Sequence, residues 1–203
     1  HTQRHKAPQR RSTQYGLQPF LQPCVTSIQQ TRLLVVPRKY PYYPVTTPGT
    51  GKLAGTEKFM QLCIRRYPSF TNLGTWVVRN IRGGKTLSTH SLGVAGDVGY
   101  PKTRAGRAQA KELWDWLIEH SEALGLCELH DYAFGDYGRG YRCSRGEGQK
   151  GVKIFTATDN AGSIGGAWLH FELEMDLAKD AKALEAAWRA LPKPQKDTAQ
   201  QAS

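Results

Sequence analysis

The chain has 203 residues, of which 39% are hydrophobic and 22% are charged, and this composition is typical of a soluble globular domain with tails. No run of apolar residues approaches the ~18 needed to cross a bilayer, and the polar N-terminus lacks the apolar core of a secretory signal, so we expect no membrane contact and no signal peptide in this chain. The four cysteines form no CxxC pair, which argues against a zinc ribbon and favours reduced thiols in the core.

Residues 1–52 differ from the rest of the chain in charge and in proline content. The formal net charge is +11, but no acidic residue precedes Glu57, and seven of the eleven prolines lie before residue 50. Because prolines at this density prevent a continuous helix, we expect an extended basic arm. Such an arm suits other subunits of a larger assembly or the anionic bacterial wall, and a solvated tail without a partner is the alternative. Nucleic acid is not the expected partner, because the remaining 20 basic and 17 acidic residues nearly balance.

Residues 53–193 carry alternating helix and strand patterns, which predict one α+β domain with helices packed on a small antiparallel sheet. The first helix is expected at 56–67, where Thr56 is a candidate N-cap. The aromatic and β-branched segment 75–81 predicts a strand. The apolar spacing over residues 104–124 predicts the longest helix, which the following glycine ends.

The second half of this domain is expected to contain a long loop, two strands and a final helix. Residues 126–150 are rich in glycine, tyrosine and charge, which is typical of a functional loop. The segments 152–156 and 168–175 predict strands, and the second alternates so that every other side chain faces away from the core. Asp176 is a candidate N-cap for the last helix, and the polar tail over residues 194–203 is expected to be flexible.

Residues 88–97 read S-x-H-x-x-G-x-A-x-D, a pattern with a chemical reason at its main positions. His90 supplies an imidazole and Asp97 a carboxylate, and Gly93 lets the chain turn so that the two converge. His170 projects from the non-core face of its strand and completes the set. Three protein ligands with an open fourth position describe a catalytic zinc site, whereas a structural site would have four. We therefore predict a Zn²⁺ cofactor on these three residues.

This pattern resembles the zinc D-Ala-D-Ala carboxypeptidases and the related phage L-alanyl-D-glutamate endopeptidases, which cut peptidoglycan stem peptides. The ten-residue motif matches at all five fixed positions, and His170-Phe-Glu172 resembles the closing H-F-E of that family. Residues 79–84, which read R-N-I-R-G-G, resemble the segment that precedes the motif in several members. The likeness covers roughly residues 56–175. It implies zinc binding by the three residues above, and contact between Arg79 and a carboxylate or carbonyl of the substrate.

The sequence departs from this family at the position of the general base. The family places a glutamate or aspartate three residues before its last ligand, and Ala167 stands there in this chain. Alanine cannot transfer a proton, and losing a general base typically costs ~10²–10⁴-fold in rate. Two other groups are candidates for this catalytic role: Glu172, on the same strand face as His170, and His130, in the segment expected to be a loop.

The sequence therefore predicts a zinc metallopeptidase that hydrolyses peptidoglycan stem peptides, as a component of a phage virion or tail or as an extracellular or cell-wall protein. The alternative is a catalytically impaired zinc-binding protein with a structural or wall-binding role in a phage particle, which Ala167 favours. A nucleic-acid binder would rest only on the net charge of +11, and the nearly neutral domain argues against it.

Overall fold

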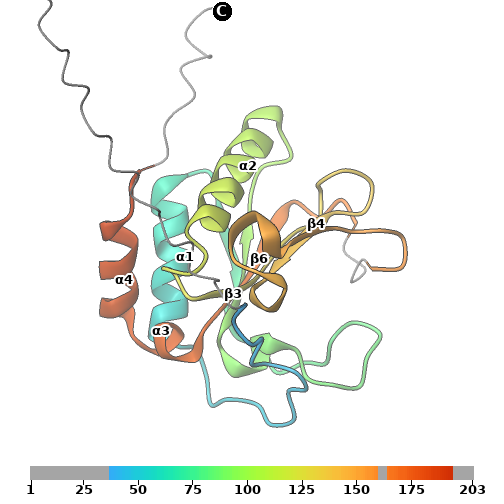
Figure 1. Cartoon of the computed structure of the whole chain (residues 1–203), viewed down its shortest axis with the longest axis vertical. Helices are drawn as coiled ribbons and strands as arrows, with labels where there is room; N and C mark the ends of the chain where they lie inside the picture. The colour runs from blue at the N-terminus through green and yellow to red at the C-terminus, as the bar shows by residue number, and fades with distance from the viewer. Residues whose placement is uncertain (1–36, 160–163, 194–203) are drawn as a thin grey trace, which may run out of the picture. The chain divides into compact units, whose positions relative to one another are not determined.

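The computed structural model describes residues 37–159 and 164–193. The predicted flexible tail and residues 1–36 of the predicted arm lie outside the described residues. A six-stranded antiparallel sheet forms the centre of the described part, with the strand order β1-β2-β6-β3-β4-β5 (Figure 1). The strands are β1 (Thr71–Gly74), β2 (Ala95–Gly99), β3 (Leu126–Asp131), β4 (Arg139–Arg142), β5 (Val152–Ile154) and β6 (Trp168–Leu173). The predicted α+β class with an antiparallel sheet is confirmed.

Helices pack on one face of this sheet and form the hydrophobic core with it. They are α1 (Ala54–Arg66), α2 (Arg104–Glu119), α3 (Met175–Lys179) and α4 (Ala181–Ala190). Figure 1 shows α1 and α4 side by side, and α1 packs against the sheet through ring contact between Phe59 and Phe171. Alternation along β6 brings Leu169, Phe171 and Leu173 into the core, each at most 1% exposed, as the sequence pattern predicts. No helix in the described ranges is long and apolar enough to span a membrane.

The predicted strand over residues 75–81 is wrong. Strand β1 ends at Gly74, and the following segment forms one isolated β-bridge, between Asn80 and Leu87. Val77 and Val78 remain 43% and 49% exposed. Their β-branched side chains favour a strand where a neighbouring strand pairs regularly, but residues 77–81 make only irregular backbone hydrogen bonds with residues 86–90.

The predicted long loop over residues 126–150 is also wrong, because this segment contains β3 and β4, which pair with each other. The glycine and the charged residues that suggested a loop have structural roles within the sheet. A Cβ atom on Gly140 would lie 2.8 Å from Cδ2 of His130, and Nε of Arg142 donates a hydrogen bond to Glu128 at 2.9 Å. These residues therefore build strands.

Two predicted helix caps differ from the structure. Helix α1 begins before Thr56, with Leu53 at its N-cap. The last helix is divided into α3 and α4, and Asp180 caps α4 by accepting hydrogen bonds from the backbone N–H groups of Lys182 and Ala183. Asp176 instead lies in the first turn of α3. Both differences follow from the local backbone, because each true N-cap is an extended residue directly before the helix.

Residues 37–45, which we call the N-terminal strap, pack on the domain and belong to the same compact unit. This part of the predicted arm is therefore not separate from the domain. Arg38 anchors the strap, because its guanidinium donates to Glu147 at 2.6 Å, to Glu174 at 2.7 Å and to the Leu126 carbonyl at 2.8 Å. Further along, the hydroxyl of Tyr42 donates to the Leu173 carbonyl.

Replacing Arg38 with alanine should lower the free energy of unfolding by about 2–3 kcal/mol, because two carboxylates and a carbonyl lose their donor in a partly buried site. Urea denaturation of both proteins measures this loss. Lys39→Ala is the matched control, since Lys39 is an exposed neighbour on the same segment. An Arg38→Ala effect below about 0.5 kcal/mol, which is typical of surface positions, would contradict the anchoring role.

Candidate metal centre

A short 3-10 helix, η1 (Thr89–Leu92), presents His90 to the sheet. The Ser88 hydroxyl caps it by accepting a hydrogen bond from the backbone N–H of His90. Gly93 ends it with a φ of 79°, and a Cβ atom there would lie 2.6 Å from the Gly51 carbonyl oxygen. A side chain at residue 93 would therefore be strained and crowded. The predicted turn at this glycine is confirmed, and the chain enters β2 directly afterwards.

The sheet register brings the other site residues into one row. Asp97 on β2 is the pairing partner of His170 on β6, and His170 is in turn the partner of His130 on β3. Side chains directly opposite each other in an antiparallel pair share a face of the sheet. This face is the one opposite to the hydrophobic core, because Leu169 and Phe171 alternate with His170 along β6.

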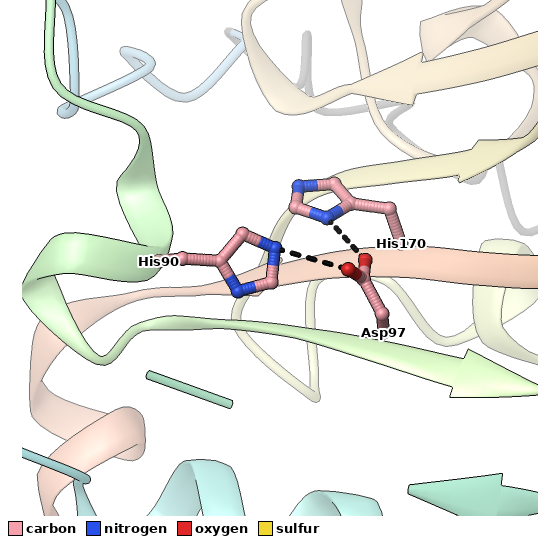
Figure 2. Close-up of side chains that lie close together, drawn as sticks. All are labelled: His90, Asp97 and His170. Atoms are coloured by element: carbon pink, nitrogen blue, oxygen red, sulfur yellow. Dashed lines mark hydrogen bonds and ion pairs between the residues drawn. The ribbon is translucent and has the colours of Figure 1, made fainter. Parts of the chain in front are cut away.

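His90, Asp97 and His170 converge on one point. Nδ1 of His170 lies 2.9 Å from Oδ1 of Asp97, and Nε2 of His90 lies 3.4 Å from Oδ2. Figure 2 shows both imidazole rings turned toward the carboxylate. One potential ligand atom from each residue lies within 4.8 Å of the other two. The arrangement could hold one metal ion, as the sequence predicts.

The chemistry of these donors fits zinc. Two imidazole nitrogens and one carboxylate oxygen are ligand types that zinc takes in catalytic sites. His90 is 3% exposed, and the one partner of its Nε2 among the described residues is the Asp97 carboxylate, at the long distance of 3.4 Å. A buried imidazole nitrogen with so weak a contact gains from a further ligand, and a bound cation would supply one.

Burial and charge give the three groups different protonation states. Burial raises the pKa of Asp97, but hydrogen bonds with His170 and His90 outweigh it and hold that pKa well below its usual range. Burial, with smaller contributions from the charges of His170 and Arg79, lowers the pKa of His90. Burial also lowers the pKa of His170, but its bonds with Asp97 and Glu172 raise it to about 10. At neutral pH the metal-free cluster therefore holds His170 as an imidazolium and His90 as a neutral imidazole.

Glu172 holds His170 from the side opposite to the metal position. Its Oε1 lies 3.2 Å from Nε2 of His170 and accepts a hydrogen bond from Thr89 at 2.7 Å. Its Oε2 accepts a hydrogen bond from the Tyr40 hydroxyl at 2.6 Å. A carboxylate on the second nitrogen of a histidine ligand fixes the ring and leaves the first nitrogen for the metal. The predicted catalytic residue Glu172 thus lies beside the cluster, with its oxygens already engaged.

His130, the other predicted proton-transfer residue, lies on the far side of His170, with 5.7 Å between the two ring centroids. Its Nε2 forms an ion pair with Glu128, and its Nδ1 lies 3.0 Å from the Tyr132 hydroxyl. Burial raises the pKa of Glu128, but His130 and Arg142 lower it to about 2. Glu128 is therefore an ionised acceptor that orients the imidazole with Nε2 as the donor.

These residues line one cavity of about 400 Å³ on the polar face of the sheet. The three candidate ligands border it, and so do all three predicted catalytic residues. Further side chains that shape it are Tyr40, Tyr43, Arg82, Tyr132, Arg142 and Trp168. The exposed Arg79 forms part of its wall. The structure thus gathers the three candidate ligands and the three predicted catalytic residues around a single cavity.

Ala167 does not belong to this group. It directly precedes β6, packs against the hydrophobic core and accepts a hydrogen bond from the backbone of Tyr100 at 3.0 Å. Leu169, two residues later, also faces the core. The neighbouring Trp168 lines the cavity. A glutamate or aspartate side chain at residue 167 would therefore leave the backbone on the core side of the strand.

Sequence reasoning missed Glu128 and Tyr40. The segment 126–131 alternates between Cys127 and Leu129, which are fully buried in the core, and Glu128 and His130, which border the cavity. This period of two is a signal for a strand that would have found Glu128. Tyr40 carries no such signal, because only the folded chain brings the strap to β6.

Comparison with protein-family models, with curated proteins and with solved structures finds no match for this chain. The family therefore stays a prediction from the motifs. The convergence of His90, Asp97 and His170 does not depend on the family.

The purified protein should bind about one equivalent of zinc, and His90→Ala should abolish stoichiometric binding, because only two ligands would remain. Metal analysis after dialysis against a weak chelator measures both. His120→Gln is the control, because His120 lies outside the cavity lining. Full retention of zinc by His90→Ala would contradict the ligand set.

Zinc affinity should rise with pH, by about tenfold per unit between roughly pH 6.5 and 8.5. Below its pKa of about 10, His170 carries a proton that zinc must displace. Raising the pH weakens this competition, whereas Asp97 and His90 are already unprotonated and add no further slope. Chelator competition at several pH values measures the dependence. A flat profile would show that zinc binding displaces no proton from His170.

Proposed function

We propose that this chain is a zinc metallopeptidase that hydrolyses peptidoglycan stem peptides, as a D-Ala-D-Ala carboxypeptidase or a related endopeptidase. One observation carries the proposal: His90 and Asp97 of the S-x-H-x-x-G-x-A-x-D motif meet His170 in the lining of a cavity. The motif supports the family, and the convergence supports the ligand set that the motif implies. A cavity of about 400 Å³ has room for a short peptide segment.

A zinc ion held by these three residues would supply Lewis-acid chemistry, polarising a peptide carbonyl and making water a better nucleophile. The chain's own groups would orient the substrate. Arg79, exposed at the cavity wall, is the proposed partner of a substrate carboxylate or carbonyl, because a guanidinium offers paired donors to such oxygens. Tyr132 and Trp168 give the cavity aromatic walls.

His130 is the group best placed to accept a proton in the absence of a carboxylate at residue 167. Glu128 accepts from Nε2, so in the neutral imidazole Nδ1 carries the lone pair, and its one neighbour there is the Tyr132 hydroxyl at 3.0 Å, which would have to turn away. This is the usual arrangement of an imidazole base oriented by a carboxylate. Glu172 is less suited to this role, because Tyr40, Thr89 and His170 already occupy its oxygens.

Placement in a phage virion or tail, or in the extracellular space at the cell wall, is proposed with this activity. Basic residues before Glu57 supply a charge complementary to acidic neighbouring subunits. Peptidoglycan peptide is the proposed substrate and partner of the cavity.

A catalytically impaired zinc-binding protein with a structural or wall-binding role is the second candidate. Ala167 favours it, because the family's general-base position carries no proton-transfer group. Such a protein would keep the metal and the cavity, but its hydrolysis rate would lack the ~10²–10⁴-fold contribution of a general base.

Purified protein loaded with zinc should release product from synthetic stem peptides, and a chelator should abolish this activity. His130→Gln should lower kcat by ~10²–10⁴-fold with little change in zinc affinity. Glu172→Gln is the matched comparison, because it should mainly weaken zinc binding, by ~10–100-fold. Mass spectrometry of the peptides and chelator competition separate the two effects.

Three other outcomes would contradict parts of this proposal. A wild-type protein that holds zinc and binds wall fragments but cuts no stem peptide would support the second candidate. An active protein that is insensitive to His130→Gln would refute the role of His130. Activity that persists after complete removal of the metal would refute the metallopeptidase assignment.

A further inference from the structure

We propose that Tyr40 of the N-terminal strap is a positioning residue of the metal centre. Its hydroxyl holds Glu172 against Nε2 of His170, and this contact leaves Nδ1 directed at the metal position. The inference deepens the proposed function and rests on the zinc site within it. It extends the site to a segment of the chain that lies far from every ligand in sequence.

The position of Glu172 depends on groups outside its own strand. Glu172 is 4% exposed, and its carboxylate is surrounded by three donors, from Tyr40, Thr89 and His170. On the β2 side, its pairing partner across the sheet is Ala95, whose methyl group offers no hydrogen bond. Thr89 holds only Oε1, so Oε2 depends on the Tyr40 hydroxyl at 2.6 Å. Removing that hydroxyl frees one side of the carboxylate to rotate.

Tyr40 is itself held firmly. The guanidinium carbon of Arg142 lies 4.4 Å from the centroid of its ring, which is the geometry of a cation–π contact. The ring of Tyr42 meets it edge-on at 5.9 Å. Arg38 anchors the strap two residues earlier through Glu147 and Glu174. The hydroxyl of Tyr40 therefore has a defined position before any metal binds.

The fixed position of the Glu172 carboxylate matters because this group is hydrogen-bonded to His170, a candidate metal ligand. The group that bonds the second nitrogen of a histidine ligand fixes the ring orientation and raises the basicity of the ligating nitrogen. Two consecutive hydrogen bonds, from Tyr40 to Glu172 and between Glu172 and His170, transmit this constraint from the strap to Nδ1 of His170. Loss of the hydroxyl should lower zinc affinity without removing any ligand.

The test compares Tyr40→Phe with Tyr42→Phe. Both variants remove one hydroxyl from the strap, but the hydroxyl of Tyr42 donates to the Leu173 carbonyl, whereas that of Tyr40 donates to Glu172. Zinc affinity is measured by competition with a chelator of known affinity, in the full chain and without substrate. Tyr40→Phe should raise the zinc dissociation constant ~10-fold, the lower end of the range for groups that support a metal ligand. Tyr42→Phe should leave it unchanged, although both variants lose a hydrogen bond.

A second comparison separates positioning from a general structural effect. In a Glu172→Ala background, Tyr40→Phe should cause no further loss of zinc affinity, because the group that transmits its effect is gone. Equal dissociation constants for Tyr40→Phe and wild type, or a full additional loss in the Glu172→Ala background, would overturn the inference. A wild-type protein that binds no zinc would overturn it together with the metal centre. If the affinities behave as expected but no stem peptide is cut, the proposed peptidase activity fails and the positioning role stands.

Discussion

Antiparallel pairing of β6 with β2 on one side and β3 on the other is the constraint on which the site depends. Its register places Asp97, His170 and His130 in one row across the sheet. The next row on the same face holds Ala95, Glu172 and Glu128. A shift of one residue in β6 would turn His170 into the core and Leu169 into the cavity. The hydrophobic alternation that stabilises the core therefore also fixes the geometry of the candidate metal centre.

The polar face of the sheet is buried, and its charges are compensated almost completely. Glu128 is paired with His130 and with Arg142, and Glu172 accepts three hydrogen bonds. Unpaired charges in such a place would be costly. His90 is the weakest case, because the one partner of its buried Nε2 within the described ranges is the Asp97 carboxylate, at 3.4 Å. A buried imidazole nitrogen held this loosely beside a carboxylate and a second imidazole is suited to binding a cation.

The strap completes this face from outside the sheet. Arg38 ties it to Glu147 and Glu174, and Tyr40 then reaches the carboxylate behind the His170 ring. The same segment lines the cavity through Tyr43. Stability and site geometry are thus coupled through nine residues that precede the first helix. The strap therefore belongs to the same compact unit as the candidate centre, although composition alone assigns it to the arm.

The sequence by itself determined the α+β class, the turn at Gly93, the alternation of β6 and the three candidate ligands, because each depends on local spacing or on residue chemistry. It failed for segments 75–81 and 126–150, since strand formation depends on a partner that local composition does not specify. Only the tertiary structure decided that Tyr40 belongs to the site. Its place follows from the anchoring of the strap, through hydrogen bonds between residues more than a hundred positions apart. Contacts of that range leave no periodic signal in the chain, so folding alone brings them together.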